Sequence, residues 1–349
     1  MPIVAHNELP SFERLQQEGV NVLSPERAHS QYIRELHIGL LNMMPDAALA
    51  ATERQFFRLV GESNPIAQFY MHPFTLPHLQ RSAKAQAYVD RYYEPFEQIR
   101  EQGLDALIIT GANVVGPELA NQPFCDPLIE VIDWAAEQVT STLCSCLATH
   151  AVLQFRYGQH RRPQPDKIWG VFPHAVVNKK HPLVADVNTR FDVPHSRWNA
   201  VERDQFDDAR LRVLVESEEV GVHLATSPDG LRFVFFQGHP EYDTISLIKE
   251  FKREVIRFGG REIERFPPFV SNYFKQRDKA VIREFAQRLR MAMADGKALP
   301  EFPEHLIVPD LDNTWHDTAE AVVGNWMGLV YQVTHRERNK PFMDGVDPN

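Results

Sequence analysis

The chain alternates between short, continuous apolar runs and longer stretches in which apolar residues recur at helical spacing. Continuous runs are typical of strands that are buried on both faces of a parallel sheet. They cover residues 37–45, 66–71, 106–112 and 141–146. Helical spacing predicts a helix capped by Asp46 and further helices at 93–102, 128–138, 245–258, 279–294 and 318–333. This alternation predicts an α/β fold, with a mostly parallel sheet flanked by helices.

The second half of the chain opens with a polar stretch. Residues after Gln159 include Pro163 and Pro165, which predicts a loop or lid. Apolar runs then predict an antiparallel section that returns to the sheet, at residues 211–215, 220–226 and 232–237. We expect an N-terminal arm, a single α/β domain and a C-terminal tail, at residues 1–36, 37–333 and 334–349.

Composition narrows the class of protein. The 349 residues have a formal net charge of −10, which argues against nucleic-acid binding because a phosphate backbone needs a basic face. The pair Arg161 and Arg162 remains a candidate contact for a phosphorylated cofactor. Cys125, Cys144 and Cys146 are too few for a disulfide framework, which indicates a reducing compartment. The chain shows no signal-peptide pattern and no apolar run of the ~20 residues that span a membrane, so we expect a cytoplasmic protein.

Cys146 lies where the strand at 141–146 is expected to pass into a helix that begins at Leu147. A thiol on such a turn is near a helix N-terminus, whose partial positive charge favours the thiolate. A nucleophile elbow also needs small residues two positions before and after the nucleophile, and Cys144 and Ala148 hold these positions. The plainer alternative is a pair of inert, buried cysteines. A metal site is disfavoured, because no nearby Cys or His pair has zinc-finger spacing.

His239 follows the apolar run at 232–237 and has a carboxylate, Glu241, two residues further on. Side chains at positions i and i+2 of an extended backbone lie on the same side, and Gly238 permits a tight turn before them. A loop histidine beside a surface carboxylate would show the same pattern. Cys146 changes the interpretation, because covalent acyl transfer requires a nucleophile, a base and a group that orients the base. We therefore interpret the chain as a cysteine-nucleophile enzyme.

These segments and others resemble the homoserine O-acyltransferase family over nearly the whole chain. The matching stretches are residues 40–45, 110–112, 140–148, 194–197 and 238–243. Their combination is highly specific, whereas each stretch alone would be weak. The resemblance implies a class I glutamine amidotransferase-like (flavodoxin-like) fold with helical N- and C-terminal extensions. It also implies a homodimer.

The resemblance further implies residue roles. The nucleophile, base and acid fall on Cys146, His239 and Glu241, and the substrate-binding residues fall on Lys167, Ser196 and Arg253. Arg253 would clamp a substrate carboxylate with its planar guanidinium, although Lys167 and Arg253 would look the same in the sequence as solvated surface cations. Backbone N–H groups at Gly111, Ala112 and Leu147 are the candidate oxyanion hole. No metal site is expected.

One position departs from the family's pattern. Shortly after Gly111, members that take succinyl-CoA resemble one another in having Gly, and members that take acetyl-CoA in having Glu. This chain has Val115 there, and Asn113 replaces a usual Pro. Valine narrows the pocket but brings no negative charge to repel a succinyl carboxylate. Val115 is therefore our candidate determinant of acyl-donor specificity, and it favours succinyl.

The activity that the resemblance implies is succinyl transfer from succinyl-CoA to the hydroxyl of L-homoserine, in methionine biosynthesis. Succinyl-CoA would be a co-substrate, and no permanently bound cofactor is expected. The same chemistry with acetyl-CoA, or with L-serine as acceptor, stays open. A glutaminase-type amidotransferase would need a synthase partner or domain, for which the C-terminal third looks too short and too helical. A non-catalytic module would have no physical need of the complete triad.

Overall fold

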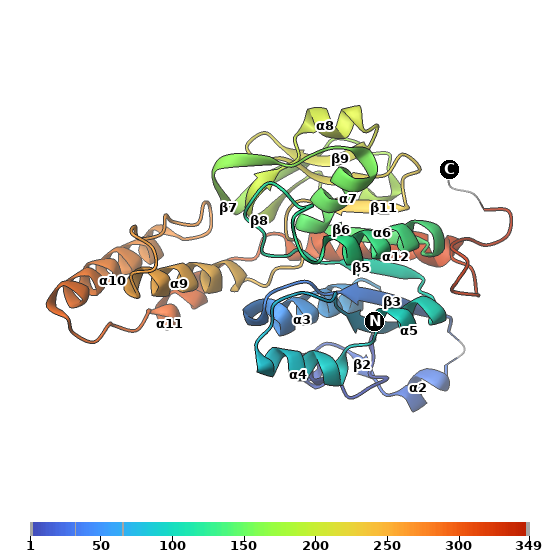
Figure 1. Ribbon diagram of the computed structural model, residues 1–349, viewed down its shortest axis with the longest axis horizontal. Coiled ribbons are helices and arrows are strands. Elements are labelled where there is room, and N and C mark those ends of the chain that lie inside the picture. The colour runs from blue at the N-terminus through green and yellow to red at the C-terminus, as the bar shows by residue number, and fades with distance from the viewer. Residues whose placement is uncertain (1–2, 32, 65, 347–349) are drawn as a thin grey trace.

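The computed structural model describes residues 3–31, 33–64 and 66–346, and within these ranges the strands form one eleven-stranded sheet (Figure 1). The strand order is β2-β1-β4-β3-β5-β6-β11-β10-β9-β7-β8. Neighbours from β2 to β11 are parallel, and neighbours from β11 to β8 are antiparallel. The predicted α/β fold with a mostly parallel sheet is confirmed. The strands are β1 (Ile3–Val4), β2 (Val22–Leu23), β3 (Glu35–Leu41), β4 (Gln68–Phe74), β5 (Ala106–Ile109), β6 (Ser141–Ser145), β7 (Arg162–Val176), β8 (Arg190–Ala200), β9 (Arg212–Ser217), β10 (Gly221–Thr226) and β11 (Phe233–Phe236).

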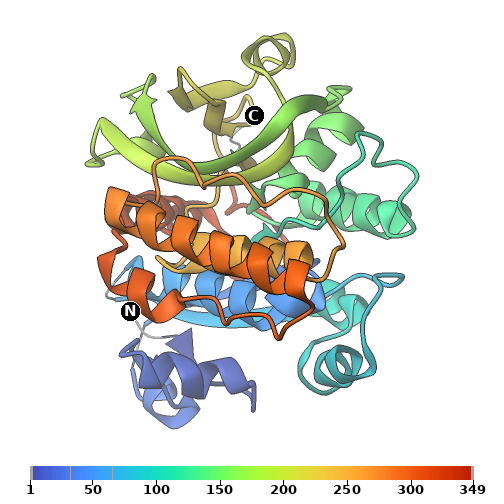
Figure 2. The same cartoon turned by 90° about the vertical axis from the view of Figure 1, so that its left-hand side faces the viewer.

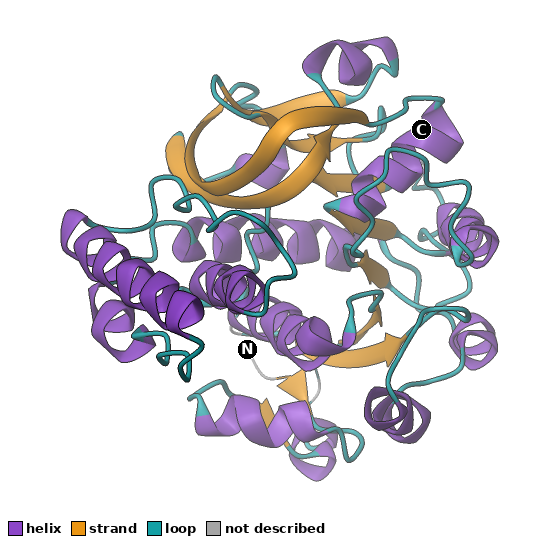
Figure 3. Cartoon of the chain, turned by 60° about the vertical axis from the view of Figure 1, so that its left-hand side comes forward, coloured by secondary structure: helices purple, strands orange, loops and turns teal. Residues whose placement is uncertain are grey.

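Helices cover both faces of the sheet, and each face has its own apolar core (Figure 3). In β5, Ala106 and Ile108 belong to the core beneath α3 and α12, whereas Leu107 and Ile109 belong to the core beneath α6 and α7. Alternate residues of a strand point to opposite faces, so a strand covered on both sides reads as a continuous apolar run. The helices are α1 (Pro10–Gln17), α2 (Pro25–His29), α3 (Asp46–Glu62), α4 (Ala83–Tyr92), α5 (Phe96–Gln102), α6 (Cys125–Gln138), α7 (Leu147–Tyr157), α8 (Arg203–Asp208), α9 (Ser246–Gly259), α10 (Gln276–Asp295), α11 (Glu304–Ile307) and α12 (His316–Val333).

Helices α9, α10 and α11 form a smaller unit that projects from the body of the molecule (Figures 1 and 2). Aromatic side chains make its core, among them Phe251 of α9 and Phe285 of α10. Trp169 of β7 packs against Phe251, with ring centroids 6.0 Å apart. A backbone bridge between Gly170 and Ser271 also ties this unit to β7. Helix α9 is therefore held next to the antiparallel part of the sheet.

Two local expectations were wrong. The polar stretch after Gln159 is the start of β7, which pairs with β8 and has a register shift between Pro163 and Ile168. Proline is tolerated at such irregular positions, because its missing N–H leaves no gap in a regular ladder. The second strand does not end before Pro73, since β4 runs on to Phe74. The helix expected at 93–102 is present as α5, and the structure adds α4, which was not predicted.

Asp46 also differs from its expected role. It is the first residue of α3, whose cap position is Pro45. The Asp46 carboxylate instead accepts a hydrogen bond from the Ser82 N–H at 2.7 Å, at the start of α4. The side chain therefore links the beginnings of two helices.

The segments expected to be an arm and a tail both contact the sheet. β1 pairs with β4 at Phe69, so the N-terminal segment extends the sheet by two short strands. Near the other end, the Thr140 hydroxyl donates to the Pro341 carbonyl. The boundaries of the arm, domain and tail stay a prediction, and residues 1–2, 32 and 347–349 lie outside the described residues. None of the helices in the described ranges combines the length and apolar character that a bilayer crossing requires.

Candidate active site

Cys146 lies between β6 and α7, in a backbone conformation that residues other than glycine rarely adopt. Its φ is 52° and its ψ is −107°. For a residue other than glycine this is strained, and such strain gathers at functional sites. Its N–H donates to the carbonyl of Phe236 at 2.7 Å, which anchors the turn to β11. Cys146 is partly exposed, whereas Cys125 and Cys144 are buried, so the sharp turn presents this thiol alone among the three.

The turn after β5 lies directly beside Cys146. A Cβ added at Gly111 would be 3.5 Å from the Cys146 Cβ and 3.9 Å from the Leu147 backbone nitrogen. The Thr110 hydroxyl donates to the Gly111 carbonyl at 3.0 Å and so helps to fix this turn. The structure thus brings Gly111 and Leu147 together at the thiol-bearing residue. The oxyanion role of these two residues and of Ala112 stays a prediction.

His239 connects Cys146 to Glu241. Its Nδ1 lies 2.8 Å from Glu241 Oε1, and its ring also hydrogen-bonds Cys146. A neutral imidazole in this position donates Nδ1–H to the carboxylate and leaves Nε2 for the thiol. The backbone just before His239 passes close to β8, and only glycine fits there, because a Cβ at Gly238 would lie only 2.6 Å from Val193 Cγ1 of β8. The predicted nucleophile, base and acid therefore lie in one hydrogen-bonded row.

The Glu241 carboxylate and Cys146 both act on the pKa of His239. Burial alone lowers the pKa of His239, but the Glu241 carboxylate and then Cys146 outweigh it, so this pKa is raised well above its ordinary value. The largely buried guanidinium groups of Arg161 and Arg197 also interact with Cys146. By contrast, burial strongly raises the pKa of Cys144, and a thiol that stays protonated is inert.

Glu250 of α9 gathers the polar groups beside the triad. Its Oε2 accepts a hydrogen bond from the Ser196 hydroxyl at 2.6 Å and lies 3.2 Å from Lys167 Nζ. Its Oε1 accepts from the Tyr242 hydroxyl at 2.8 Å. Burial raises the pKa of Glu250, but Lys167 and the two hydroxyl donors overcome this and lower it. The result is a partly buried carboxylate that stays ionised and is linked to His239 through Tyr242, which hydrogen-bonds Glu250 and stacks on the His239 ring.

Sequence reasoning missed Tyr242 and Glu250. The available signals were weak: Tyr242 follows Glu241 in the motif at 238–243, and Glu250 lies one helical turn before Arg253. Arg253 itself is exposed, and its Nε lies 3.5 Å from Glu254 Oε1. Positions three apart lie on the same side of a helix, so Arg253 is a neighbour of Glu250 but not part of its hydrogen-bonded group.

Val115 lies in the loop that follows Gly111. Its side chain is 58% exposed, and its carbonyl accepts a hydrogen bond from Asn199 Nδ2 at 3.0 Å. Arg161 holds the same loop by donating to the carbonyls of Val114, Gly116 and Pro117. The loop backbone is thus fixed while the Val115 side chain stays accessible. Its contact with an acyl group stays a prediction.

A pocket of about 850 Å³ lies on the far side of the triad's acid. Glu241, Tyr242 and Asp243 line it, together with Arg58, which forms an ion pair with Asp243. Cys146 is not among the described residues that line this pocket. The pocket therefore borders Glu241 and Tyr242, which contact His239, and does not border the Cys146 thiol.

The sequence is similar to known proteins along its whole length. A family model described as homoserine O-succinyltransferase matches residues 2–336. Homoserine O-succinyltransferase of Allochromatium vinosum is 66% identical over 349 residues, which cover 100% of this chain and 98% of that protein. The protein of the same name from Thiobacillus denitrificans is 67% identical with the same coverage.

Solved structures of similar shape are more remote in sequence. A glutamine amidotransferase of Thermotoga maritima is 12% identical, with a TM-score of 0.45 over 85% of this chain and 98% of that one. A glutamine amidotransferase of Methylobacillus flagellatus is 14% identical, with a TM-score of 0.47 over 85% and 95%. The full-length matches are the decisive ones: the chain belongs to the homoserine O-succinyltransferase family.

Proposed function

We propose that this protein transfers the succinyl group of succinyl-CoA to the hydroxyl of L-homoserine, an early step of methionine biosynthesis. The supporting observation is the row formed by strained Cys146, His239 and Glu241. The names of relatives that are 66% and 67% identical supply the donor and the acceptor. We further expect a cytoplasmic homodimer without a permanently bound cofactor.

The first half-reaction forms an acyl-enzyme. The Cys146 thiolate attacks the thioester carbonyl of succinyl-CoA, and N–H groups near Gly111 and Leu147 stabilise the oxyanion. The bond between the acyl carbon and the sulfur of coenzyme A then breaks. The His239 imidazolium gives its proton to the departing thiolate, which leaves coenzyme A as a thiol and His239 neutral. Glu241 keeps Nδ1 protonated throughout.

The second half-reaction uses the neutral His239 as a base. It takes the hydroxyl proton of L-homoserine while the oxygen attacks the acyl carbon. The bond from that carbon to Cys146 sulfur breaks, so the thiolate and the imidazolium are both restored. General acid–base catalysis of this kind contributes on the order of 10²–10⁴-fold to the rate.

Charges beside the triad suit an amino acid as acceptor. Glu250 is an ionised, partly buried carboxylate that can pair with an ammonium group, and Lys167 can pair with a carboxylate. Ser196 already donates to Glu250 and so orients it. Arg253, one turn along α9, is placed to meet the acceptor's carboxylate from the exposed side.

Intact-protein mass spectrometry after incubation with succinyl-CoA alone tests this proposal. We expect one succinyl group on Cys146 and release of one coenzyme A thiol, followed by discharge when L-homoserine is added. Cys146→Ala should form no adduct and lose turnover, while Cys144→Ala and Cys125→Ala should fold and keep most activity. Full activity of Cys146→Ala would refute the mechanism.

The same experiment separates the alternatives. Stronger labelling by acetyl-CoA would make the protein an acetyltransferase, and discharge by L-serine would change the acceptor. Glutamine hydrolysis without labelling by either acyl-CoA would indicate a glutaminase. A protein that neither labels nor hydrolyses glutamine would be a non-catalytic module.

A further inference from the structure

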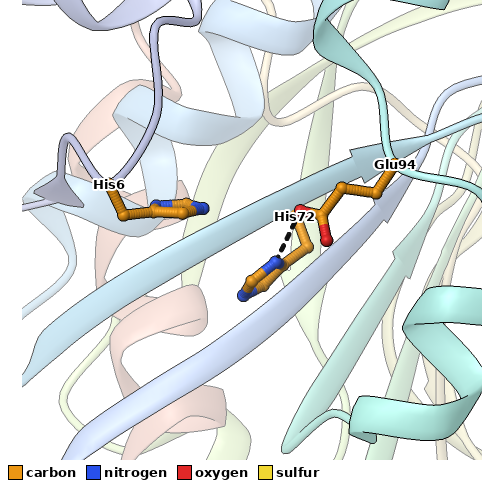
Figure 4. Close-up of side chains that lie close together, drawn as sticks. All are labelled: His6, His72 and Glu94. Atoms are coloured by element: carbon orange, nitrogen blue, oxygen red, sulfur yellow. Dashed lines mark hydrogen bonds and ion pairs between the residues drawn. The ribbon is translucent and has the colours of Figure 1, made fainter.

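Three segments far apart in the sequence bring two imidazoles and a carboxylate together (Figure 4), in a group that does not include Cys146. His6 follows β1, His72 lies in β4, and Glu94 lies between α4 and α5. One ligand atom from each lies within 4.8 Å of the other two. His72 is buried, while His6 and Glu94 are partly exposed, so the group is sheltered but open to an ion from solvent.

The hydrogen bonds of His6 leave the nitrogen that a metal needs. Its Nδ1 lies 3.1 Å from the Val4 carbonyl, so Nδ1 carries the proton and Nε2 keeps its lone pair. The contact at Nε2 is a long one, 3.4 Å from Asn7 Nδ2. A histidine that binds a metal commonly donates its other N–H to a backbone carbonyl, which fixes the ring and its tautomer.

His72 is supported in a similar way. Its Nδ1 lies 2.7 Å from Glu94 Oε1, and its Nε2 lies 2.9 Å from His37 Nδ1. His37 Nε2 in turn lies 3.7 Å from Glu35 Oε1. If a cation replaces the proton on His72 Nδ1, the Nε2–H donates to His37 and the His37 N–H faces Glu35. This row gives the ligand the carboxylate-backed support typical of metal-binding histidines.

We propose that His6 Nε2, His72 Nδ1 and the Glu94 carboxylate bind a divalent transition-metal ion, best matched by Zn²⁺. Two imidazoles and one carboxylate are a common zinc ligand set, with the fourth tetrahedral position left for water. The ligand atoms need to settle at about 3.3 Å from one another for bonds of about 2.1 Å, which small rotations of His6 and Glu94 supply. The ion would fasten the N-terminal segment to β4.

A second group in the described chain serves as a control. His316 Nε2 lies 2.7 Å from Glu320 and 3.4 Å from Glu62, which is an ordinary ion-pair arrangement with a single imidazole. A single imidazole with two carboxylates gives a softer ion such as Zn²⁺ only one nitrogen ligand. His316→Ala should therefore leave zinc binding unchanged.

The test is a titration of the chelator-treated full-length protein with Zn²⁺ by isothermal titration calorimetry, repeated with Co²⁺ by absorption spectroscopy. We expect one Zn²⁺ ion to bind tightly to each protein chain and to raise its unfolding temperature. With Co²⁺ we expect a tetrahedral absorption spectrum without thiolate charge-transfer bands. His6→Gln and His72→Gln should lose both the tight binding of Zn²⁺ and the stabilisation that Zn²⁺ gives. His37→Gln should weaken binding by about 10–100-fold, the usual effect of removing a supporting partner.

Circular dichroism without metal shows whether each variant folds, and His6→Gln should fold because His6 is only partly buried. The proposal is overturned if the folded wild-type protein takes up no Zn²⁺, or if His6→Gln and His72→Gln bind it as the wild type does. It is equally overturned if Cys146→Ala abolishes binding, since the ion would then sit on the catalytic thiol.

Discussion

The ring of Tyr242 stacks on the ring of His239, with centroids 4.4 Å apart and planes inclined by 18°. The hydroxyl of the same tyrosine donates to Glu250 at 2.8 Å. The orientation of the base is thus mechanically linked to the carboxylate that we assign to the acceptor. One side chain thus connects the base that we propose to the carboxylate that we propose binds the acceptor.

This link predicts that Tyr242→Phe separates the two half-reactions. Phenylalanine keeps the stacking on His239 but leaves Glu250 without one donor, and a hydrogen bond to a charged group is worth about 1.5–3 kcal/mol. We expect discharge of the acyl-enzyme by L-homoserine to slow by about 10-fold or more, with little change in acylation. Single-turnover measurements of each step check this. Equal slowing of both steps would show that the hydroxyl supports the whole site.

His239 and Glu241 should act as one unit. If Glu241 serves only to orient and charge-balance His239, then removing it from a His239→Ala protein should cost little further activity. The measurement is a double-mutant cycle on kcat/KM with His239→Ala, Glu241→Ala and the double variant. Losses that multiply independently would instead give Glu241 a role of its own, for example at the pocket that it lines.

The raised pKa of His239 predicts how stability depends on pH. The folded state holds this proton more tightly than the unfolded chain, whose histidine pKa is about 6.5. The resulting stabilisation is complete below about pH 6.5 and is lost as the pH rises through the folded value. We expect the free energy of unfolding to fall as the pH rises from about 6.5 to 9, and to fall less in His239→Gln. This pH range lies below the pKa of an ordinary tyrosine.

Urea unfolding at a series of pH values tests this expectation. His29→Gln, at an exposed histidine near the end of α2, is the matched control and should behave as the wild type. Parallel curves for the wild type and His239→Gln would mean that the imidazolium is not stabilised in the folded protein.

Val115→Glu should shift the choice of acyl donor. The Val115 side chain is largely exposed on a loop whose carbonyls are held by Arg161 and Asn199, so the substitution should not disturb folding. A carboxylate there would oppose the terminal charge of the succinyl group. We expect the ratio of kcat/KM for succinyl-CoA over acetyl-CoA to fall by a factor of about 10 or more. Val115→Gln, of the same size without the charge, should leave the ratio nearly unchanged; the same shift in both variants would point to steric exclusion.

The pattern of apolar residues along the chain was enough to predict strands that are buried on both faces and helices that carry one apolar stripe. The strand at Ala106–Ile109 and the helix at Cys125–Gln138 were predicted nearly in place, because their apolar residues report burial directly. Neither β7 nor β8 was predicted. Those strands are defined by pairing with each other, and such pairing is a property of the tertiary structure.

The site shows the same division. The structure brings Cys146, His239 and Glu241 together, while their catalytic roles stay a prediction, and the family resemblance is confirmed by the full-length matches. Glu250 was invisible because one carboxylate on an amphipathic helix looks like part of a solvated face. Only the folded chain brings Lys167 to it from β7.

The pairing of β6 with β11 sets Ser145 opposite Phe236, so Cys146 and His239 follow the ends of two neighbouring, hydrogen-bonded strands. Their separation is dictated by main-chain hydrogen bonds that substitutions of side chains leave intact. Part of the acceptor site that we propose, by contrast, comes from α9 in the projecting unit. On this proposal, substitutions in one appended helix would change which molecule receives the acyl group and would leave the paired strands that precede Cys146 and His239 unchanged.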